Sequence, residues 1–187
     1  MTIRNMHSPR HERWLPHPAL AERALIRPWL TDRGSLTARI RARCDRFEVQ
    51  VLQQRLALPL VDERALLGRV RPSSALVREV LLCADGVPVV FAHSVVLPRH
   101  LRGAWHLVAG LGARPLGAVL FADASVKRGR LHFKRLGPRD PRWQRAIGSA
   151  ALSSPGPLWA RRSVFLRRDL PLLVTEVFLP TIASLKR

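Results

Sequence analysis

The sequence has 187 residues and a mass of 21.1 kDa, a size that predicts one domain. Hydrophobic residues make up 47% of the chain, enough to form a core, and this excludes a wholly disordered protein. The formal net charge is +19, from 32 basic and 13 acidic residues. Two cysteines exclude a disulfide framework and a four-cysteine zinc site, and no apolar stretch is long enough to span a bilayer.

The charge indicates an anionic partner: a nucleic acid, an anionic lipid or an acidic small molecule. The arginines are scattered, however, and their densest groups lie within residues 39–46, 128–135 and 161–168. Nucleic-acid modules usually interleave basic groups with exposed aromatic residues, but aromatic residues are only 6% of this chain. We therefore interpret the excess charge as an arginine-rich solvated surface without specific nucleic-acid binding, and weak association with an anionic membrane stays open.

Residues 1–17 are polar and basic and contain no apolar signal segment. We expect them to form a flexible N-terminal tail before a single domain of residues 18–187. The predicted helical segments are residues 18–34, residues 36–44 after an N-cap at Ser35, and residues 98–120, interrupted by glycines and a proline.

Strands are predicted wherever apolar and polar residues alternate. These strands cover residues 47–51, 76–83, 87–97, 126–136, 158–168 and 171–179. Ala84-Asp85-Gly86 and Arg168-Asp169 are turn signals that join two pairs of strands as hairpins. Residues 137–157 are rich in Pro, Gly and Ser and predict a long loop with one helical turn near 143–147. Because short turns join the strands, we expect an α+β fold built on a single antiparallel sheet.

No cofactor motif is complete in the sequence. Gly110-Leu111-Gly112 opens a dinucleotide-binding pattern, but Pro115 occupies the third glycine position and no strand precedes it. The sequence has no Walker loop, no nucleophile elbow and no HExxH motif. Cys83 lies in an apolar strand and is interpreted as a buried structural thiol rather than a nucleophile. We expect neither a metal nor a cofactor.

Two charged residues fall on apolar strand faces. In the strand 76–83, alternation places Arg78 among leucine and valine side chains, on a face that should be core. An unpaired buried guanidinium is very costly, so Arg78 should meet a carboxylate. In the strand 171–179, Glu176 is the only charge, and a donor or a cation must stabilise its carboxylate if it is buried.

Two explanations fit this pattern. Arg78 and Glu176 could form structural ion pairs, either with each other or with Glu79 and a neighbour. Alternatively, they lie in a closed apolar cavity, where Arg78 binds the carboxylate of an anionic ligand and Glu176 binds its hydroxyl. The residue pattern alone leaves both explanations open.

Several stretches around these residues resemble the chorismate pyruvate-lyase family of bacterial ubiquinone synthesis. They are Trp29-Leu30 through Gly34-Ser35-Leu36-Thr37, Val77-Arg78-Glu79-Val80-Leu81-Leu82-Cys83-Ala84-Asp85-Gly86, Pro115-Leu116-Gly117 with Leu120-Phe121, and Trp159-Ala160-Arg161-Arg162-Ser163 leading into Pro171-Leu172-Leu173-Val174-Thr175-Glu176-Val177-Phe178-Leu179-Pro180. The resemblance runs in order from about Trp14 to Pro180. The Arg-Glu-x-x-Leu-Cys and Thr-Glu-x-Phe-Leu-Pro elements together are its most specific part.

The resemblance implies an antiparallel sheet with helical flaps that enclose a buried ligand cavity. It implies a cytoplasmic, monomeric enzyme that converts chorismate to 4-hydroxybenzoate and pyruvate without a cofactor. By this likeness Arg78 and Glu176 are the catalytic residues. Arg78 would bind the ring carboxylate, bidentately where geometry allows, and Glu176 would hydrogen-bond the ring hydroxyl. Leu36 and Leu116 would contact the ring from the flaps.

A second cation should meet the pyruvyl carboxylate, and Arg161, Arg162 and His93 are candidates. Other family members often carry arginine where this sequence has His93. Leu36 stands where some members have methionine, a conservative apolar exchange. The loop 137–157 is longer than in the most compact members. It could alter access to the site or decorate the surface, and we favour decoration.

A second function class shares this fold: the small-molecule-sensing modules of transcription regulators. Such modules follow a DNA-binding helix-turn-helix domain, and the chain before Phe47 is too short to supply one. A non-catalytic sensor of small aromatic acids is therefore the alternative to the lyase. A binder of nucleic acid or anionic membrane has little support beyond net charge, and it predicts salt-sensitive binding to phosphate polymers.

Overall fold

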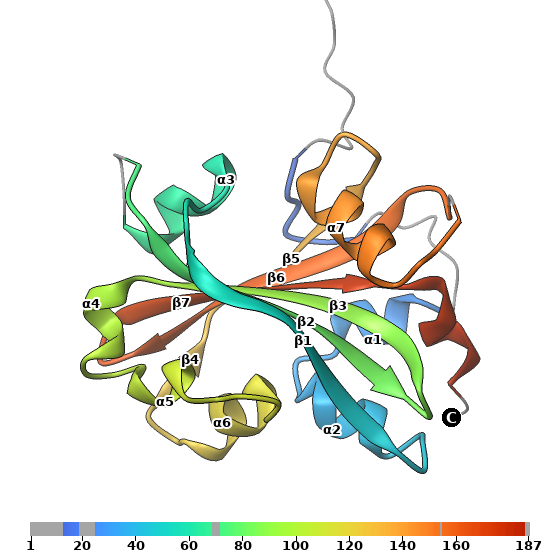
Figure 1. The fold of residues 1–187 in the computed structure, drawn as a ribbon, viewed down its shortest axis with the longest axis horizontal. Coiled ribbons are helices and arrows are strands. Elements are labelled where there is room, and N and C mark those ends of the chain that lie inside the picture. Colours follow the sequence, from blue (N-terminus) through green and yellow to red (C-terminus); the bar gives the residue numbers. More distant parts are fainter. Residues whose placement is uncertain (1–12, 19–24, 69–71, 154, 186–187) are drawn as a thin grey trace, which may run out of the picture.

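The computed structural model describes residues 13–18, 25–68, 72–153 and 155–185. Within these ranges, seven antiparallel strands form one twisted sheet with helices on both faces (Figure 1). The strand order is β1-β2-β3-β7-β6-β4, and β5 pairs with the other half of β6. The strands are β1 (Phe47–Ala57), β2 (Ala75–Ala84), β3 (Val87–Val96), β4 (Val126–Arg128), β5 (His132–Leu136), β6 (Leu158–Arg167) and β7 (Leu170–Phe178). The predicted α+β fold with a single antiparallel sheet is confirmed.

The predicted strands are all present, with two differences in extent. The first strand is longer than predicted and continues to Ala57. The segment 126–136 is divided at Gly129, whose N–H donates to the carbonyl oxygen of Val164 at 2.8 Å. A Cβ atom at Gly129 would lie 3.0 Å from that oxygen, so this close backbone approach favours glycine and separates β4 from β5.

Two tight turns join β2 to β3 and β6 to β7. The φ angles are 50° and 79° at Asp85 and Gly86, and 51° and 58° at Arg168 and Asp169. Two consecutive positive φ angles are typical of the type I′ turn, whose twist matches that of the flanking strands. The Asp85 carboxylate also accepts the Arg46 N–H at 2.8 Å, which ties the first turn to the start of β1. Both predicted hairpins are confirmed.

The helices are short. They are α1 (Arg27–Thr31), α2 (Leu36–Arg41), α3 (Val61–Arg64), α4 (Pro98–Leu101), α5 (His106–Ala109), α6 (Leu116–Ala122) and α7 (Pro141–Ser149), with 3-10 turns at Ala65–Leu67 and Pro180–Ser184. Ser35 caps α2 as predicted, because its Oγ accepts the Ala38 N–H at 3.2 Å. The helix predicted over 18–34 includes residues 19–24, which lie outside the described residues. None of the described helices is long and apolar enough to cross a membrane.

The segment 137–157 contains more helix than the sequence indicates. Helix α7 spans nine residues rather than one turn. The Asp140 carboxylate caps it by accepting the Arg142 N–H at 3.0 Å, and Trp143 and Ala146 recur at helical spacing in a core cluster against the sheet. The interpretation of this segment as surface decoration is wrong, because Arg142 is only 2% exposed and belongs to a buried network of charges.

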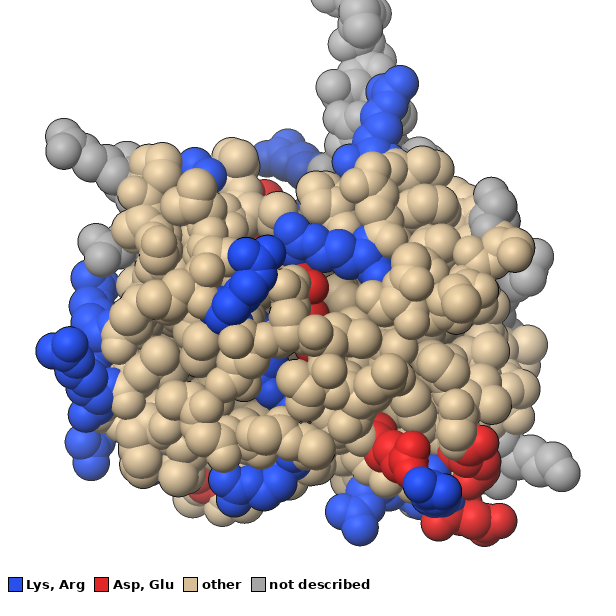
Figure 2. Space-filling model, viewed as in Figure 1, with Lys and Arg blue, Asp and Glu red and all other residues tan. Residues whose placement is uncertain are grey.

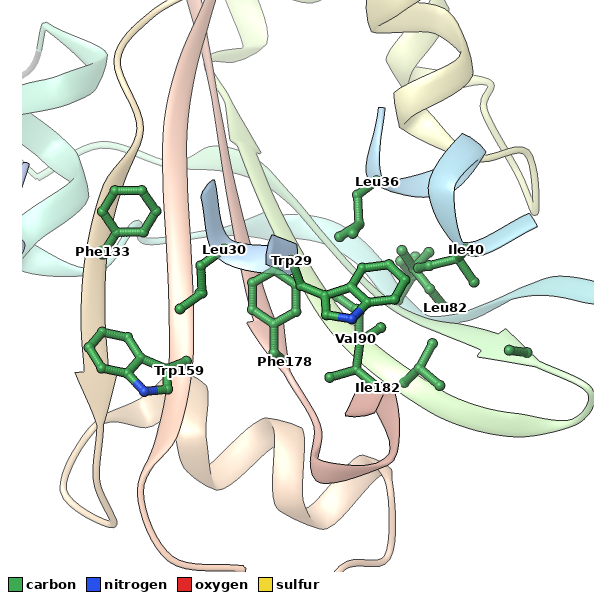
Figure 3. Close-up of a cluster of buried hydrophobic side chains, with 13 residues drawn as sticks. Trp29, Leu30, Leu36, Ile40, Leu82, Val90, Phe133, Trp159, Phe178 and Ile182 are labelled. Atoms are coloured by element: carbon green, nitrogen blue, oxygen red, sulfur yellow. The ribbon is translucent and has the colours of Figure 1, made fainter. Parts of the chain in front are cut away.

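Strand alternation gives the sheet two different faces. Helices α1, α2, α5 and α6 lie on one face, and α3 and α7 lie on the other (Figure 1). On the first face, Trp29 and Ile40 pack against Leu82, Val90 and Phe178 (Figure 3). Burial of an apolar side chain of this size contributes roughly 1.5–3 kcal/mol. This cluster therefore holds α1 and α2 in a fixed place on the sheet.

The buried charge network occupies the opposite face, beneath α3 and α7. His93 lies between two glutamates, with Nε2 3.1 Å from the Glu63 carboxylate and Nδ1 2.9 Å from the Glu79 carboxylate. Arg142 and Arg145 of α7 pair with Glu63 at 3.4 Å and with Glu79 at 2.7 Å. In Figure 2, acidic side chains lie at the bottom of a hollow, beneath basic ones. Each buried carboxylate thus has a cation, as burial requires.

The end of the predicted N-terminal tail also contacts this face. The guanidinium groups of Arg142 and Arg162 lie over the Trp14 ring, at 5.3 and 4.2 Å from its centroid. The Trp14 Nε1–H donates to Asp62 at 2.7 Å, and the backbone of Leu15 forms a β-bridge with β5. Residues 1–12 of that tail lie outside the described residues.

The network shifts the ionisation of its members. Burial alone would lower the pKa of His93, but hydrogen bonds to Glu63 and Glu79 outweigh it and raise that pKa to about 9. Burial opposes the charge on Glu79, yet its hydrogen bond to His93 lowers the pKa of this carboxyl to about 2. A histidine whose pKa is higher in the folded than in the unfolded state stabilises the fold while it is protonated.

We expect the free energy of unfolding to fall as the pH rises from about 6.5 to about 9, because the unfolded chain loses the His93 proton near 6.5 whereas the folded protein holds it up to about 9. The loss should amount to a few kcal/mol. Urea unfolding at several pH values between 6 and 10 would measure it. His93→Gln should remove most of this slope, whereas the control His106→Gln, at an exposed position, should keep it. Equal slopes in the native protein and His93→Gln would contradict the assignment.

Candidate functional site

A pocket lies on the face that carries α2 and α6, over the middle of β2, β3 and β7. Most of its wall is apolar, and its charged groups are two arginines and one glutamate. The lining residues are Leu36, Thr37, Val49, Arg78, Val80, Leu82, Ala92, Ser94, Pro115, Leu116, Gly117, Leu120, Phe121, Arg128, Phe165, Val174 and Glu176. All four residues predicted from the sequence, Arg78, Glu176, Leu36 and Leu116, belong to this set. Their roles toward a ligand remain predictions.

Arg78 lies on the pocket side of β2 and is 3% exposed. Its Nη2 donates to the carbonyl oxygens of Gly112 and Arg114, at 2.9 and 3.2 Å, while its Nε is buried without an acceptor. Burial lowers the pKa of this guanidinium. Within the described residues no carboxylate pairs with Arg78. The described part of the chain therefore does not supply the carboxylate partner that the sequence predicts. The backbone carbonyls orient the guanidinium and leave its remaining donors for a ligand.

Glu176 reaches the pocket from β7, and its carboxylate accepts a hydrogen bond from Arg161 Nε at 2.5 Å. Arg161 is fully buried on β6, opposite Glu176 in the strand register. The Arg161 Nη1 also donates to three carbonyl oxygens at the end of α1, those of Trp29, Leu30 and Asp32. The structural ion pair considered for Arg78 with Glu176 does not form, because each residue has other partners.

The two helices beside the pocket begin at the two predicted leucines. Leu36 is the first residue of α2 and Leu116 the first of α6, and both are buried. The helices contact each other closely, since a Cβ atom at Gly117 would lie 2.9 Å from Thr37 Oγ1. The pocket therefore lies against the sheet beneath the junction of these two helices.

Arg128 is a further pocket residue, in addition to the four predicted from the sequence. It comes from β4 at the edge of the sheet, and its Nε donates to Ser163 Oγ at 3.0 Å. Its Nη1 donates to the carbonyl oxygens of Arg33 and Gly34. Burial lowers the pKa of Arg128 to about 10. The signal in the sequence was the alternation of Val126 and Arg128, which places this arginine on the inner face of its strand.

Two of the three candidates for a second cation lie on the wrong face of the sheet. Ala92 and Glu176 are register partners and both face the pocket, so the adjacent His93 faces the other way. Arg162 follows Arg161 on β6 and therefore also faces away from the pocket. It pairs with Asp62 at 3.0 Å in the buried network. Arg161 is on the pocket face but is engaged by Glu176 and the α1 carbonyls.

The donor set of the pocket suits an organic anion rather than a metal. Guanidinium groups bind carboxylates well and repel metal cations. No group of three or more metal-ligating side chains occurs among the residues that the structure describes. Apolar walls with a few convergent polar groups are typical of small-molecule sites.

A family model described as chorismate lyase matches residues 9–187 of the chain. Among the curated relatives, a protein of Aromatoleum aromaticum named "Probable chorismate pyruvate-lyase" is 58% identical over 182 residues, which cover 95% of this chain and 97% of the relative. A protein of the same name from Azoarcus sp. (strain BH72) is 51% identical, over 93% of this chain and 94% of the relative.

Similar solved structures share the fold at low sequence identity. The effector domain of PhnF from Mycobacterium smegmatis has a TM-score of 0.57 at 15% identity, over 79% of this chain and 89% of that chain. The ligand-binding domain of a GntR-family transcriptional regulator from Bordetella bronchiseptica has a TM-score of 0.52 at 18% identity, over 72% of this chain and 85% of that chain. These likenesses agree with a single antiparallel sheet in an α+β fold.

Proposed function

The chain belongs to the chorismate lyase family, and on this premise we propose that it converts chorismate to 4-hydroxybenzoate and pyruvate. The observation that carries the proposal is the position of Arg78 and Glu176 in one mostly apolar pocket. A carboxylate-binding guanidinium and a hydrogen-bond acceptor for a hydroxyl are the groups that a hydroxylated ring acid requires.

The proposed reaction is an elimination. The bond between the ring and the ether oxygen breaks, and the neighbouring ring carbon, which bears the hydroxyl, loses its hydrogen. The electron pair of that C–H bond completes the aromatic ring, and the enolpyruvate that leaves takes up a proton on carbon to become pyruvate. The reaction is redox-neutral, so its balance needs no external oxidant or reductant, and we propose that it proceeds without a cofactor.

We assign Arg78 to the ring carboxylate. Its Nη2 is held by two backbone carbonyls, so the planar group is fixed before a ligand arrives. Such preorganisation lowers the entropic cost of binding. A buried guanidinium without an internal carboxylate gains its counter-charge from the ligand.

We assign Glu176 to the ring hydroxyl at the far end of the substrate. Its hydrogen bond with Arg161 orients the carboxylate, which lines the pocket. A carboxylate accepts a hydrogen bond from the ring hydroxyl. Its negative charge stabilises the positive charge that develops on the ring as the ether bond breaks. Leu36 and Leu116 would cover the ring and exclude water from it.

The resemblance also suggests a place in the cell. We propose that the chain acts in the cytoplasm as a monomer, in the first committed step of ubiquinone synthesis. On the face drawn in Figure 2 the basic side chains form separate groups, so this face gives little support to a nucleic-acid or membrane surface. The net charge of +19 would instead attract the dianionic substrate, an effect that salt weakens.

Purified protein mixed with chorismate alone should release pyruvate and 4-hydroxybenzoate in equal amounts, faster than the uncatalysed background. Coupled measurement of both products in the presence of a metal chelator would establish the reaction. Binding of 4-hydroxybenzoate without turnover would instead favour a non-catalytic sensor of small aromatic acids, the alternative that the shared fold of regulator effector domains suggests. Absence of both binding and turnover would refute the proposal.

Arg78→Lys should lower kcat/KM on the order of 100-fold, because an ammonium cannot reproduce the planar fork of a guanidinium. The matched control is Arg168→Lys in the exposed β6–β7 turn, which should retain native activity. Steady-state kinetics would provide the comparison, with thermal unfolding to verify folding. Full activity of Arg78→Lys would show that bidentate carboxylate binding is wrong.

Glu176→Gln should lower kcat by roughly 100-fold, because the neutral amide cannot stabilise positive charge on the ring. The substitution also leaves Arg161 without its carboxylate, so we expect a lower melting temperature. Glu48→Gln, at the edge strand β1, controls for loss of a negative charge. A folded Glu176→Gln protein with native kcat would contradict the assignment.

A further inference from the structure

The charges that line the pocket do not cancel. Its charged residues are Arg78, Arg128 and Glu176, and Glu176 is already neutralised by Arg161. Within the described residues, neither Arg78 nor Arg128 forms an ion pair with a carboxylate. In the described part of the chain, two guanidinium groups therefore face the pocket without an ion-pair partner, and a ligand that pairs with both carries two negative charges.

The contacts of Arg128 leave part of its guanidinium free for a ligand. Its Nε is held by Ser163, and its Nη1 by the carbonyl oxygens of Arg33 and Gly34. The remaining nitrogen, Nη2, has no protein acceptor in the described part of the chain. The guanidinium carbon of Arg128 lies over the rings of Phe121 and Phe165, at 5.6 and 5.3 Å from their centroids, and both rings attract the cation.

Arg128 lies at the end of the pocket where Glu176 is found. Ser163, which holds its Nε, lies two residues from Arg161 on the same face of β6, and Arg161 binds Glu176. The charge of Glu176 acts on Arg128 and favours its protonated form. Arg78 is anchored instead by the Gly112–Arg114 segment that precedes α6.

Chorismate fits this arrangement of charges, given the proposed function. Its ring carboxylate lies opposite its hydroxyl, and its ether substituent is attached next to the hydroxyl. With the ring carboxylate on Arg78 and the hydroxyl on Glu176, the side-chain carboxylate falls at the Glu176 end. We propose that Arg128 binds the enolpyruvyl carboxylate of the substrate, and that it distinguishes the dicarboxylate substrate from the monocarboxylate ring product.

This assignment has a consequence for the reaction. When the ether bond breaks, the enolpyruvyl group leaves with the carboxylate that Arg128 binds and with the charge that develops on its oxygen. A guanidinium beside this group stabilises the developing charge. The ring product, 4-hydroxybenzoate, has no carboxylate at that end and makes no contact with Arg128.

The test compares two ligands that do not react. One is 4-hydroxybenzoate, with a single carboxylate. The other is 3-(carboxymethoxy)-4-hydroxybenzoate, which adds an ether-linked carboxylate next to the hydroxyl. Calorimetric titration would measure both dissociation constants for the native protein, Arg128→Met, Arg128→Lys and the control Lys127→Met. Lys127 is exposed on the same strand, and its loss changes the net charge equally.

Arg128→Met should bind the dicarboxylate on the order of 100-fold more weakly than the native protein and bind 4-hydroxybenzoate equally well. It should also raise KM for chorismate and lower kcat/KM, and Arg128→Lys should restore part of the dicarboxylate affinity. Lys127→Met should resemble the native protein. An equal loss of affinity for both ligands would overturn the proposal, because Arg128 would then act only by holding Arg33 and Gly34.

The ligand titration separates this inference from the proposed function. If the native protein binds the dicarboxylate through Arg128 but does not turn chorismate over, the carboxylate subsite stands and the lyase activity fails. If chorismate is turned over with a native kcat/KM in Arg128→Met, the lyase activity stands and the Arg128 assignment fails. If the native protein binds neither ligand and does not turn chorismate over, both fail.

Discussion

The buried guanidinium of Arg161 connects the site to the rest of the fold. It lies on β6 with no exposed surface, and one side of it holds the Glu176 carboxylate while another binds carbonyls at the end of α1. The unpaired carbonyls at a helix C-terminus favour a cation. A single side chain thus orients the acidic group of the pocket and fixes the helix that leads into α2. Its long, planar shape lets it do both, which a lysine could not.

The alternation of side chains across the sheet keeps two charged centres apart. Along β3, Ala92 and Ser94 face the pocket, while His93 faces the network of α3 and α7. The network is compensated within the chain, with His93 and arginines beside the glutamates Glu63 and Glu79. The pocket is left with surplus positive charge. One face therefore contributes to stability, and the other is suited to bind an anion.

Much of the fold and part of the site could be predicted from the sequence. Alternation and turn residues were sufficient for the strands and for both hairpins, because these signals are local. Alternation also marked Arg78 and Glu176 as charges on apolar faces, and the family resemblance added Leu36 and Leu116. All four line the same pocket.

The remaining features depend on partners distant in the sequence. The Pro- and Gly-rich flanks of helix α7 indicate a loop. The helix is held to the sheet by long-range contacts such as that of Arg142 with Glu63, 79 residues away, which local sequence does not show. The family resemblance makes His93 a candidate cation for the pyruvyl carboxylate, but strand alternation turns it to the face opposite the pocket. Alternation places Arg128 on the inner face of its strand, but the pairing of β4 with β6, which brings it to the pocket, does not follow from the local sequence.

The contacts of Trp14 attach the described end of the N-terminal segment to the folded domain. Its indole lies against Arg142 and Arg162, and its N–H is bound by Asp62. Trimming the chain at residue 17, where sequence composition suggests a boundary, would remove this ring. Water would then reach Arg142 and Arg162. Their ion pairs with Asp62 would weaken, because exclusion of water strengthens such pairs. Shortened versions of the protein made for crystallisation should therefore keep Trp14, and a protease that cleaves after it would loosen α7 from the sheet.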